Sequence, residues 1–189
     1  LAYIQNVDKI VGPGNKFVAE AKRQISGKIV GTESMFAGPS EICVVADKFT
    51  NINQIATSLV SQAEHDPNSQ CILLTKDKTI LPKVNLTIKK IIKLLPRKKI
   101  ATQSLNNHGL IILLKNDKEI VNTINLIAPE HLEINVKNYK KYVNKIYNVG
   151  SICNGKFTPM SLSDYTVGTN HILPTSGSAK FSSGLSINE

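Results

Sequence analysis

Polar residues that can bind a metal ion or move a proton gather in a few short segments of the sequence. The first is SQAEH, residues 61–65, which lies before Asp66 and Pro67 at the end of an expected amphipathic helix. On a helix, Gln62 and His65 are three residues apart and share one face, so one metal ion can meet both. A capped, solvated helix end is the competing interpretation, because zinc prefers His, Cys and carboxylate ligands to glutamine.

Two further segments contain residues suited to acid–base chemistry or ligand binding. APEHLEI places Glu130 and His131 next to each other in a turn between a helix and a strand. Adjacent side chains are expected to diverge, so one would activate water while the other moves protons at a carbinol. In SDYTVGTNHILPT, Asp164 can complete a metal shell and His171 can bind a polar or anionic group. Surface turns and loops are the alternatives for both segments.

A glycine-containing turn, GPGN, joins a strand-like segment to a helix-like one near the start of the chain. Gly12 and Gly14 allow the backbone to approach a ligand closely. Asn15 opens a helix whose free N–H groups favour an anion such as a pyrophosphate. The third glycine of the usual dinucleotide fingerprint is missing, so a plain strand-to-helix turn is the competing account.

The elements that must position these residues alternate along the chain. Continuous apolar strands joined by helices predict an α/β fold, a Rossmann-like parallel sheet with flanking helices, plus part of a second α/β domain before Ala37. In such sheets ligands collect at the carboxyl ends of the strands. Strands are expected at 42–46, 71–75, 110–114, 132–136 and 150–154, and helices near 51–64, within 76–99, near 116–127 and over 137–148.

Charge and composition exclude several classes of protein. The formal net charge is +9, and residues 76–99 contribute +8 of it through eight Lys and one Arg against one Asp. Apolar residues recur there at helical spacing, which favours a solvated helix face over a nucleic-acid or membrane surface. No apolar run approaches the roughly 20 residues of a membrane span, and no secretory signal is seen, so we expect a cytoplasmic protein. Cys43, Cys71 and Cys153 are expected to be buried reduced thiols.

Taken in order, GPGN, AGPSE, SQAEH, PEHLE and SDYTVGTNHILPT resemble the histidinol dehydrogenase family over almost the whole chain. AGPSE followed about twenty residues later by SQAEH is typical of that family, and GTNHILPT is nearly as specific. The resemblance implies a zinc- and NAD-dependent oxidation of L-histidinol to L-histidine through an aldehyde, the last step of histidine biosynthesis. It also implies a homodimer with one zinc ion per subunit, and no nucleic-acid or membrane partner.

The resemblance assigns roles to residues by position. It implies zinc ligation by Gln62, His65 and Asp164, water activation by Glu130, and acid–base catalysis by His131. The remaining assignments are substrate contacts for Ser40 and His171 and a contact between Asn15 and NAD, while the zinc ligands and Glu130 also bind the substrate.

The family likeness also sets expectations about domains and completeness. Residues 1–37 would form the C-terminal part of an NAD-binding α/β domain, and residues 38–189 a zinc- and substrate-binding α/β domain that is incomplete at its C-terminus. A fourth zinc ligand, a histidine, and the remaining NAD contacts would lie outside the chain, so we expect an inactive fragment. The sequence departs from the family at Ser34, Phe36, Ser58 and Ser163.

Two rival functions remain open from the residues themselves. A zinc hydrolase would use Glu130 to activate water without a nucleotide, although the GPGN turn argues against it. A basic, non-enzymatic nucleic-acid binder would use the lysines of residues 76–99 and would tolerate loss of Glu130.

Overall fold

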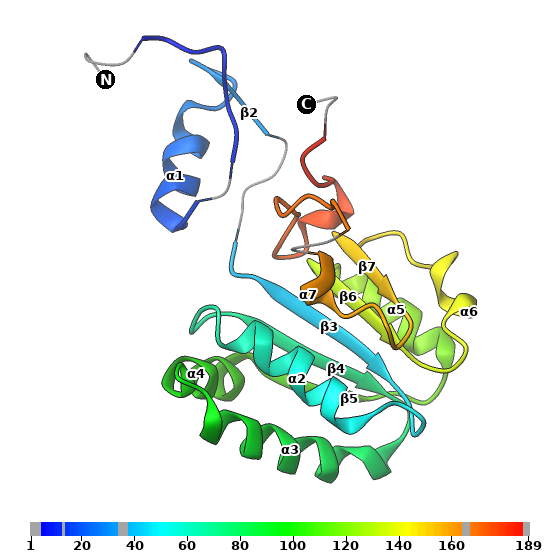
Figure 1. The fold of residues 1–189 in the computed structure, drawn as a ribbon. Coiled ribbons are helices and arrows are strands. Elements are labelled where there is room, and N and C mark those ends of the chain that lie inside the picture. The colour runs from blue at the N-terminus through cyan, green and yellow to red at the C-terminus, as the bar shows by residue number, and fades with distance from the viewer. Residues whose placement is uncertain (1–4, 13, 34–37, 164–166, 187–189) are drawn as a thin grey trace.

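A small unit at the start of the chain contains a parallel pair of short strands. The computed structural model describes residues 5–12, 14–33, 38–163 and 167–186. Strands β1 (Lys9–Ile10) and β2 (Gly31–Thr32) pair in parallel, and helix α1 (Lys16–Ile25) connects them. In Figure 1 this unit lies beside the main sheet and does not cover either of its faces.

The main sheet has five parallel strands in the order β5-β4-β3-β6-β7, which confirms the predicted α/β fold with a parallel sheet. All six residues of β3 are buried. This strand pairs with β4 on one side and β6 on the other, so its sequence after Glu41, ICVVA, is apolar without alternation. The bounds are β3 Glu41–Ala46, β4 Gln70–Thr75, β5 Gly109–Leu113, β6 His131–Asn135 and β7 Ser151–Asn154.

Helices cover both faces of this sheet because successive side chains of a strand point to opposite sides. Ile42 and Val44 of β3 belong to a core shared with one layer of helices, and Cys43 and Val45 belong to a second core on the other face. The first layer consists of α2 (Ile52–Ala63), α3 (Leu81–Leu94) and α4 (Lys98–His108), and the second contains α5 (Asp117–Ile127) and α6 (Lys140–Val143). Figure 1 shows α2, α3 and α4 together on one side.

The basic segment 76–99 contributes to two helices. α3 ends at Leu94, and Leu95 has an extended backbone (φ −80°, ψ 138°) because a residue before proline avoids the helical conformation. The predicted apolar stripe is confirmed, since Val84 is fully buried and Ile88 and Ile92 pack against the same core. The lysines of α3 are exposed, as expected for a solvated face.

The segment 137–148 differs from the predicted helix, because only the four residues of α6 are helical. Tyr142 is 2% exposed, and its hydroxyl donates a hydrogen bond to Asp117 Oδ1 at 2.6 Å. Lys76 and Lys141 each lie 2.5 Å from the same carboxylate. Contacts with Asp117, in the first turn of α5, therefore hold this segment in place. Outside α6 it does not form a regular helix.

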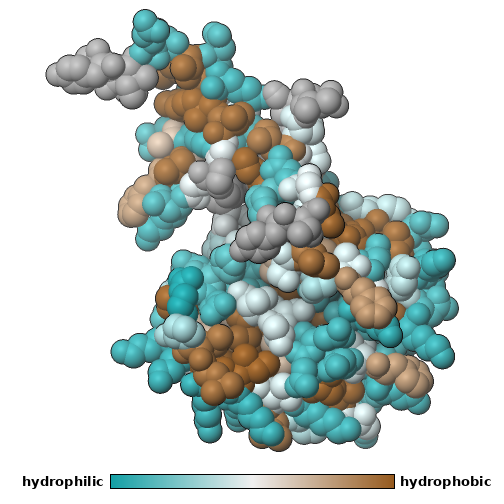
Figure 2. Space-filling view, in the orientation of Figure 1, coloured by the Kyte–Doolittle hydropathy of each residue, from teal (hydrophilic) through white to brown (hydrophobic). Residues whose placement is uncertain are grey.

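One edge of the main sheet is apolar and exposed. In the outermost strand β5, Leu110 is 55% exposed and Leu113 is 50% exposed. Figure 2 shows a hydrophobic area over the adjoining parts of α3 and α4, surrounded by hydrophilic surface. Within the described ranges, no helix has the length and apolar character to cross a membrane. The remaining short elements are η1 (Lys78–Ile80), α7 (Met160–Ser163) and η2 (Ser178–Lys180).

Candidate active site

Most of the predicted site residues that the structure describes lie at the amino edge of the main sheet, where its strands begin. Ser40 directly precedes β3, Glu130 directly precedes β6, and His131 opens β6 opposite Ile42. Helix α2 returns from the carboxyl ends of the strands to this edge and brings the SQAEH segment with it. The general expectation that ligands collect at the carboxyl ends therefore does not fit these residues.

Glu130 and Glu41 bind each other reciprocally through backbone and side chain. The Glu41 N–H donates to Glu130 Oε2 at 2.9 Å, and the Glu130 N–H donates to Glu41 Oε2 at 3.3 Å. Only 6% of Glu130 and 4% of Glu41 is exposed. Burial raises the pKa of the Glu41 carboxyl, and the backbone N–H groups of Ser176 and Glu130 offset part of that rise. Two carboxyl groups are thus held in a dry environment at the edge of the sheet.

His131 lies between Glu130 and Ser151. Its Nε2 is 3.5 Å from Glu130 Oε1, and its Nδ1 is within hydrogen-bond distance (3.0 Å) of Ser151 Oγ. The side chains of Glu130 and His131 therefore approach each other, whereas the sequence alone predicts that they diverge. Ser151 orients the ring, which leaves Nε2 on the side of Glu130, a suitable arrangement for proton transfer at one small substrate.

The local backbone explains why these two residues are presented at a strand start. Helix α5 is ended by Ala128, which takes a left-handed conformation (φ 53°, ψ 58°), and Pro129 follows. The Ser151 N–H then donates to the Glu130 carbonyl at 2.8 Å. Gly150 is required beside this bond, because a Cβ there would lie 2.5 Å from the Glu130 carbonyl oxygen. The end of α5 at Ala128 and the hydrogen bond from Ser151 therefore both constrain the backbone of Glu130.

The two predicted ligands of the SQAEH segment differ in exposure. Gln62 is 2% exposed, whereas His65 is exposed. No hydrogen bond joins the side-chain amide of Gln62 to another described residue, and its atoms are not among the fully enclosed polar atoms that lack a partner. The Arg97 guanidinium donates to the His65 carbonyl at 3.0 Å and so fixes the backbone beyond α2.

The third predicted ligand, Asp164, lies outside the described residues, as do the departures Ser34 and Phe36. Of the residues that are described, no three His, Cys, Asp or Glu side chains form a metal-binding group. This result is consistent with the predicted ligand set, which contains a glutamine, one described histidine and Asp164. The geometry of the complete set therefore remains a prediction.

The segment that carries His171 reaches the same edge of the sheet. His171 is exposed. The Gly38 N–H donates to Thr175 Oγ1 at 2.5 Å, and the Ser176 N–H donates to Glu41 Oε1 at 3.1 Å. These bonds hold residues 175–176 against the AGPSE segment, next to Ser40.

Asn15 is located in the N-terminal unit, where it caps α1. Its side-chain oxygen accepts hydrogen bonds from the N–H groups of Phe17 and Val18 at 3.0 and 3.2 Å. The prediction that the first N–H groups of this helix are free is therefore wrong for these two. Lys22, which is buried, donates to the Gly12 carbonyl and forms an ion pair with Glu33, so it connects α1 to both of these residues.

Sequence reasoning gave no role to Glu41 or Ser151, although both contact the predicted catalytic pair. A glutamate at the first position of a fully buried strand is a usable signal for Glu41, because a buried carboxylate needs donors close by. No comparable signal exists for Ser151, since a serine at the start of a strand is common.

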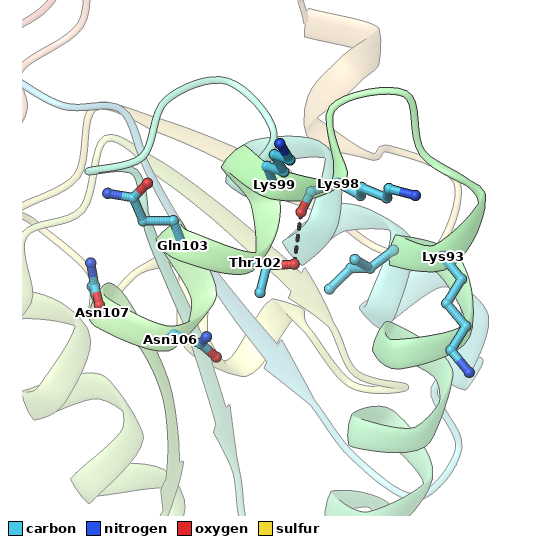
Figure 3. Close-up of a pocket in the computed structure, with 8 residues that line it drawn as sticks. Lys93, Lys98, Lys99, Thr102, Gln103, Asn106 and Asn107 are labelled. Atoms are coloured by element: carbon cyan, nitrogen blue, oxygen red, sulfur yellow. Dashed lines mark hydrogen bonds between the residues drawn. The ribbon is translucent and has the colours of Figure 1, made fainter.

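Some cavities of the described surface lie away from the predicted site residues. Figure 3 shows one of about 560 Å³ between α3 and α4, whose lining includes Lys93, Lys98 and Thr102. Another, of about 750 Å³, lies at the carboxyl edge beside Asn135 and Lys137. Neither is lined by a predicted site residue. The cysteines agree with expectation, since Cys43, Cys71 and Cys153 are buried and form no disulfide.

Comparisons with known proteins show that the sequence is similar to one family. The family model described as histidinol dehydrogenase matches residues 1–189. Curated histidinol dehydrogenases from Pelagibacter ubique and Hydrogenovibrio crunogenus are 56% and 49% identical, over 98% and 96% of the chain. The chain spans 43% and 41% of the length of these two relatives.

Solved structures agree with the sequence comparison. The crystal structure of histidinol dehydrogenase from Elizabethkingia anophelis matches with a TM-score of 0.93 and 42% identity, over 98% of this chain and 42% of that one. A propionaldehyde dehydrogenase from Clostridium phytofermentans matches with a TM-score of 0.55 and 16% identity, over 96% of this chain and 54% of that one. This second likeness concerns the fold alone.

Proposed function

Because the chain belongs to the histidinol dehydrogenase family, we propose that the full-length protein oxidises L-histidinol to L-histidine through an aldehyde-level intermediate. This reaction is the last step of histidine biosynthesis. NAD, when bound, supplies the oxidising power for the two hydride transfers. The observation that carries the proposal is the buried Glu130–His131 pair at the amino edge, within a chain that matches the family from end to end.

His131 is proposed as the acid–base group in both oxidations. Its Nδ1 lies beside Ser151 Oγ, so we assign the proton exchange with the substrate hydroxyl to Nε2. Glu130 is proposed to take a proton from the water that adds to the aldehyde. Its Oε2 accepts the Glu41 N–H, and its Oε1 lies on the His131 side. Acid–base catalysis by His131 and water activation by Glu130 are therefore assigned to two side chains that lie 3.5 Å apart.

We propose that Gln62, His65 and Asp164 hold a zinc ion. The donor set is suitable, because a neutral amide oxygen, an imidazole and a carboxylate can all ligate zinc. Gln62 is 2% exposed and lies in the last turn of α2 at the amino edge of the sheet, which supports this role. When bound, zinc supplies a point of attachment for the imidazole and amino group of histidinol, so that the carbinol is positioned for oxidation.

Substrate and cofactor contacts are proposed for three further residues. Ser40 and His171 belong to segments that meet at the amino edge, where the Gly38 and Ser176 N–H groups bind the opposite segment. These two residues would contact histidinol. Asn15 would contact NAD through its amide nitrogen, since its amide oxygen caps α1.

The organisation of the whole protein is also a proposal. Residues 1–37 would complete an NAD-binding α/β domain, and residues 38–189 would form the zinc- and substrate-binding domain. The family likeness supports a cytoplasmic homodimer with one zinc ion per subunit. A fourth zinc ligand and further NAD contacts would come from parts of the relatives that this chain does not match, so the 189 residues alone would be inactive.

Two substitutions in the full-length protein test the proposed roles. His131→Asn should slow both oxidations, whereas Glu130→Gln should slow mainly the oxidation of the aldehyde, each by about 10²- to 10⁴-fold. NADH formation is measured from histidinol and, separately, from the aldehyde. If Glu130→Gln leaves aldehyde turnover unchanged, the assignment of Glu130 fails.

The same assay distinguishes the proposed dehydrogenase from the alternative function, a zinc hydrolase. A protein that forms no NADH from histidinol, but hydrolyses a substrate in a zinc- and Glu130-dependent way, would replace the dehydrogenase proposal.

A further inference from the structure

A third buried acid, Glu41, connects the proposed catalytic residues with a distant part of the chain. Its Oε2 accepts the N–H of Glu130, 89 residues away, and its Oε1 accepts the N–H of Ser176, 135 residues away. Its own N–H donates to Glu130 Oε2. One residue therefore contacts the backbone of Glu130, the carboxylate of Glu130 and the segment that follows His171.

We propose that Glu41 is a positioning residue that fixes Glu130 and the 171–176 segment relative to each other, so that water activation and substrate binding occur at one place. The inference rests on the proposed function, because it assigns Glu41 a part in the same reaction. Glu41 itself does not touch the reacting atoms in this proposal. It acts through Glu130.

The chemistry of the side chain supports this role. A carboxylate has two acceptor oxygens, and each oxygen of Glu41 receives one backbone N–H. Glutamine offers only one acceptor oxygen, so in a Glu41→Gln variant one of the two N–H groups faces an NH₂ group. Aspartate keeps both oxygens but withdraws them by one methylene. Neither replacement reproduces both contacts.

The neighbouring backbone also indicates a constraint. Ser176 takes a left-handed conformation (φ 54°), which a residue other than glycine adopts at a cost in free energy. In that conformation its N–H meets Glu41 Oε1. Gly38, three residues before Glu41, is bound to Thr175 on the same segment. Gly38 and Glu41 on one segment thus bind the adjacent residues Thr175 and Ser176 on the other, which is more than one incidental hydrogen bond.

Weakening the hydrogen bonds that the Glu41 carboxylate accepts should displace the Glu130 side chain and leave it chemically intact. The Glu130 carboxylate would keep the N–H of residue 41, but its own backbone would lose an anchor at the start of β6. Small displacements of a catalytic group of this kind lower rates by up to about 100-fold. The step that depends on activated water should suffer most.

The test uses full-length protein and compares Glu41→Gln with Glu119→Gln. Glu119 is a matched control, because its carboxylate also accepts a backbone N–H, from Lys115 at 2.8 Å, but it lies at the start of α5. Glu41→Gln should lower aldehyde turnover by about 10- to 100-fold and affect histidinol turnover less, with zinc content unchanged. Glu119→Gln should change neither rate.

A double-mutant cycle separates positioning from general damage. If Glu41 acts through Glu130, adding Glu41→Gln to Glu130→Gln should cause little further loss of aldehyde turnover. Fully multiplicative losses, or wild-type aldehyde turnover in Glu41→Gln, would overturn the proposal. Glu41→Asp provides a second variant if the glutamine variant does not fold, and the same selective loss is expected for it.

Hydrogen exchange distinguishes failure of this inference from failure of the proposed function. If the wild-type protein does not oxidise histidinol, the function is wrong, but the contacts of Glu41 can still be measured. At least one of the backbone amides of Glu130 and Ser176 should exchange faster in Glu41→Gln than in wild type or Glu119→Gln. Unchanged exchange at both amides would refute the positioning role whatever the activity.

Discussion

Replacing Ser58 with alanine should destabilise the protein through its effect on a buried carboxylate. Ser58 Oγ donates to Glu133 Oε2 at 2.7 Å, from helix α2 to strand β6. Glu133 is 1% exposed and also accepts the Met160 N–H at 2.6 Å and the Asn135 amide at 3.1 Å. The alanine would remove one of three donors from a group with little access to water.

The size of the effect follows from the state of Glu133. A hydrogen bond to an ionised group contributes about 1.5–3 kcal/mol to stability, and one between neutral groups about 0.5–1.5 kcal/mol. Alanine regains roughly 0.5 kcal/mol through its higher helix propensity. The net cost of Ser58→Ala should therefore be about 1–2.5 kcal/mol when Glu133 is ionised, and close to half of that or less when it is protonated.

The sign of the pH dependence can be worked out from the pKa of Glu133. Burial raises this pKa above 4.5 in the folded protein, and the hydrogen bonds from Met160, Ser58 and Asn135 offset part of the rise. The contribution of Glu133 to stability is therefore present below the unfolded-state pKa and is lost as pH rises through the folded-state pKa. Without Ser58 Oγ the pKa rises further, so the cost of Ser58→Ala should increase with pH.

Denaturant-induced unfolding at an acidic and a neutral pH measures both quantities. Thr57→Ala is the matched control, because Thr57 is the exposed neighbour on the same helix. It should change the unfolding free energy by no more than about 0.5 kcal/mol at either pH. If Ser58→Ala behaves like Thr57→Ala, or if its cost falls as pH rises, the reasoning about Glu133 is wrong.

Two other predictions concern the opposite face of the sheet and the thiols. Tyr142→Phe should cost about 1 kcal/mol of unfolding free energy in thermal or chemical denaturation, because it removes the 2.6 Å hydrogen bond to Asp117 while keeping the buried ring; a stability equal to that of wild type would contradict this. Cys71, whose pKa burial raises to about 12, should not react with a thiol reagent in the folded protein at neutral pH, together with the other two cysteines. Rapid labelling before unfolding would show that the cores open.

Much of the fold could be predicted because local patterns and tertiary structure agree. The apolar run 42–46 has no alternation, as a central strand covered on both faces requires, and it belongs to β3, the middle strand of the sheet. The segment 137–148 was harder, since its tyrosines and lysines follow a helical spacing. Tyr142 instead packs in the core and binds Asp117, a contact that no local pattern encodes.

The candidate site could be predicted in its residue types but not in its contacts. Glu130 and His131 are recognisable as a polar pair before a strand, yet their 3.5 Å approach depends on Ser151 in the neighbouring strand. Glu41 was overlooked because its partner Ser176 is 135 residues away. Contacts between residues so far apart in the sequence depend on the order of strands in the sheet and on where the loops pack. Neither can be predicted from the spacing of residues along the chain.

The direction of α2 gives the two edges of the sheet opposite electrostatic character. A helix carries roughly half a negative charge at its C-terminal end and half a positive charge at its N-terminal end. The last turn of α2 contains no basic residue, although Arg97 donates to the His65 carbonyl just beyond it, and this negative end lies at the amino edge with Gln62 and His65. Its positive end lies at the carboxyl edge, beside the cavity lined by Lys137 and Lys156. The macrodipole thus favours a cation where the strands begin and disfavours one where they finish.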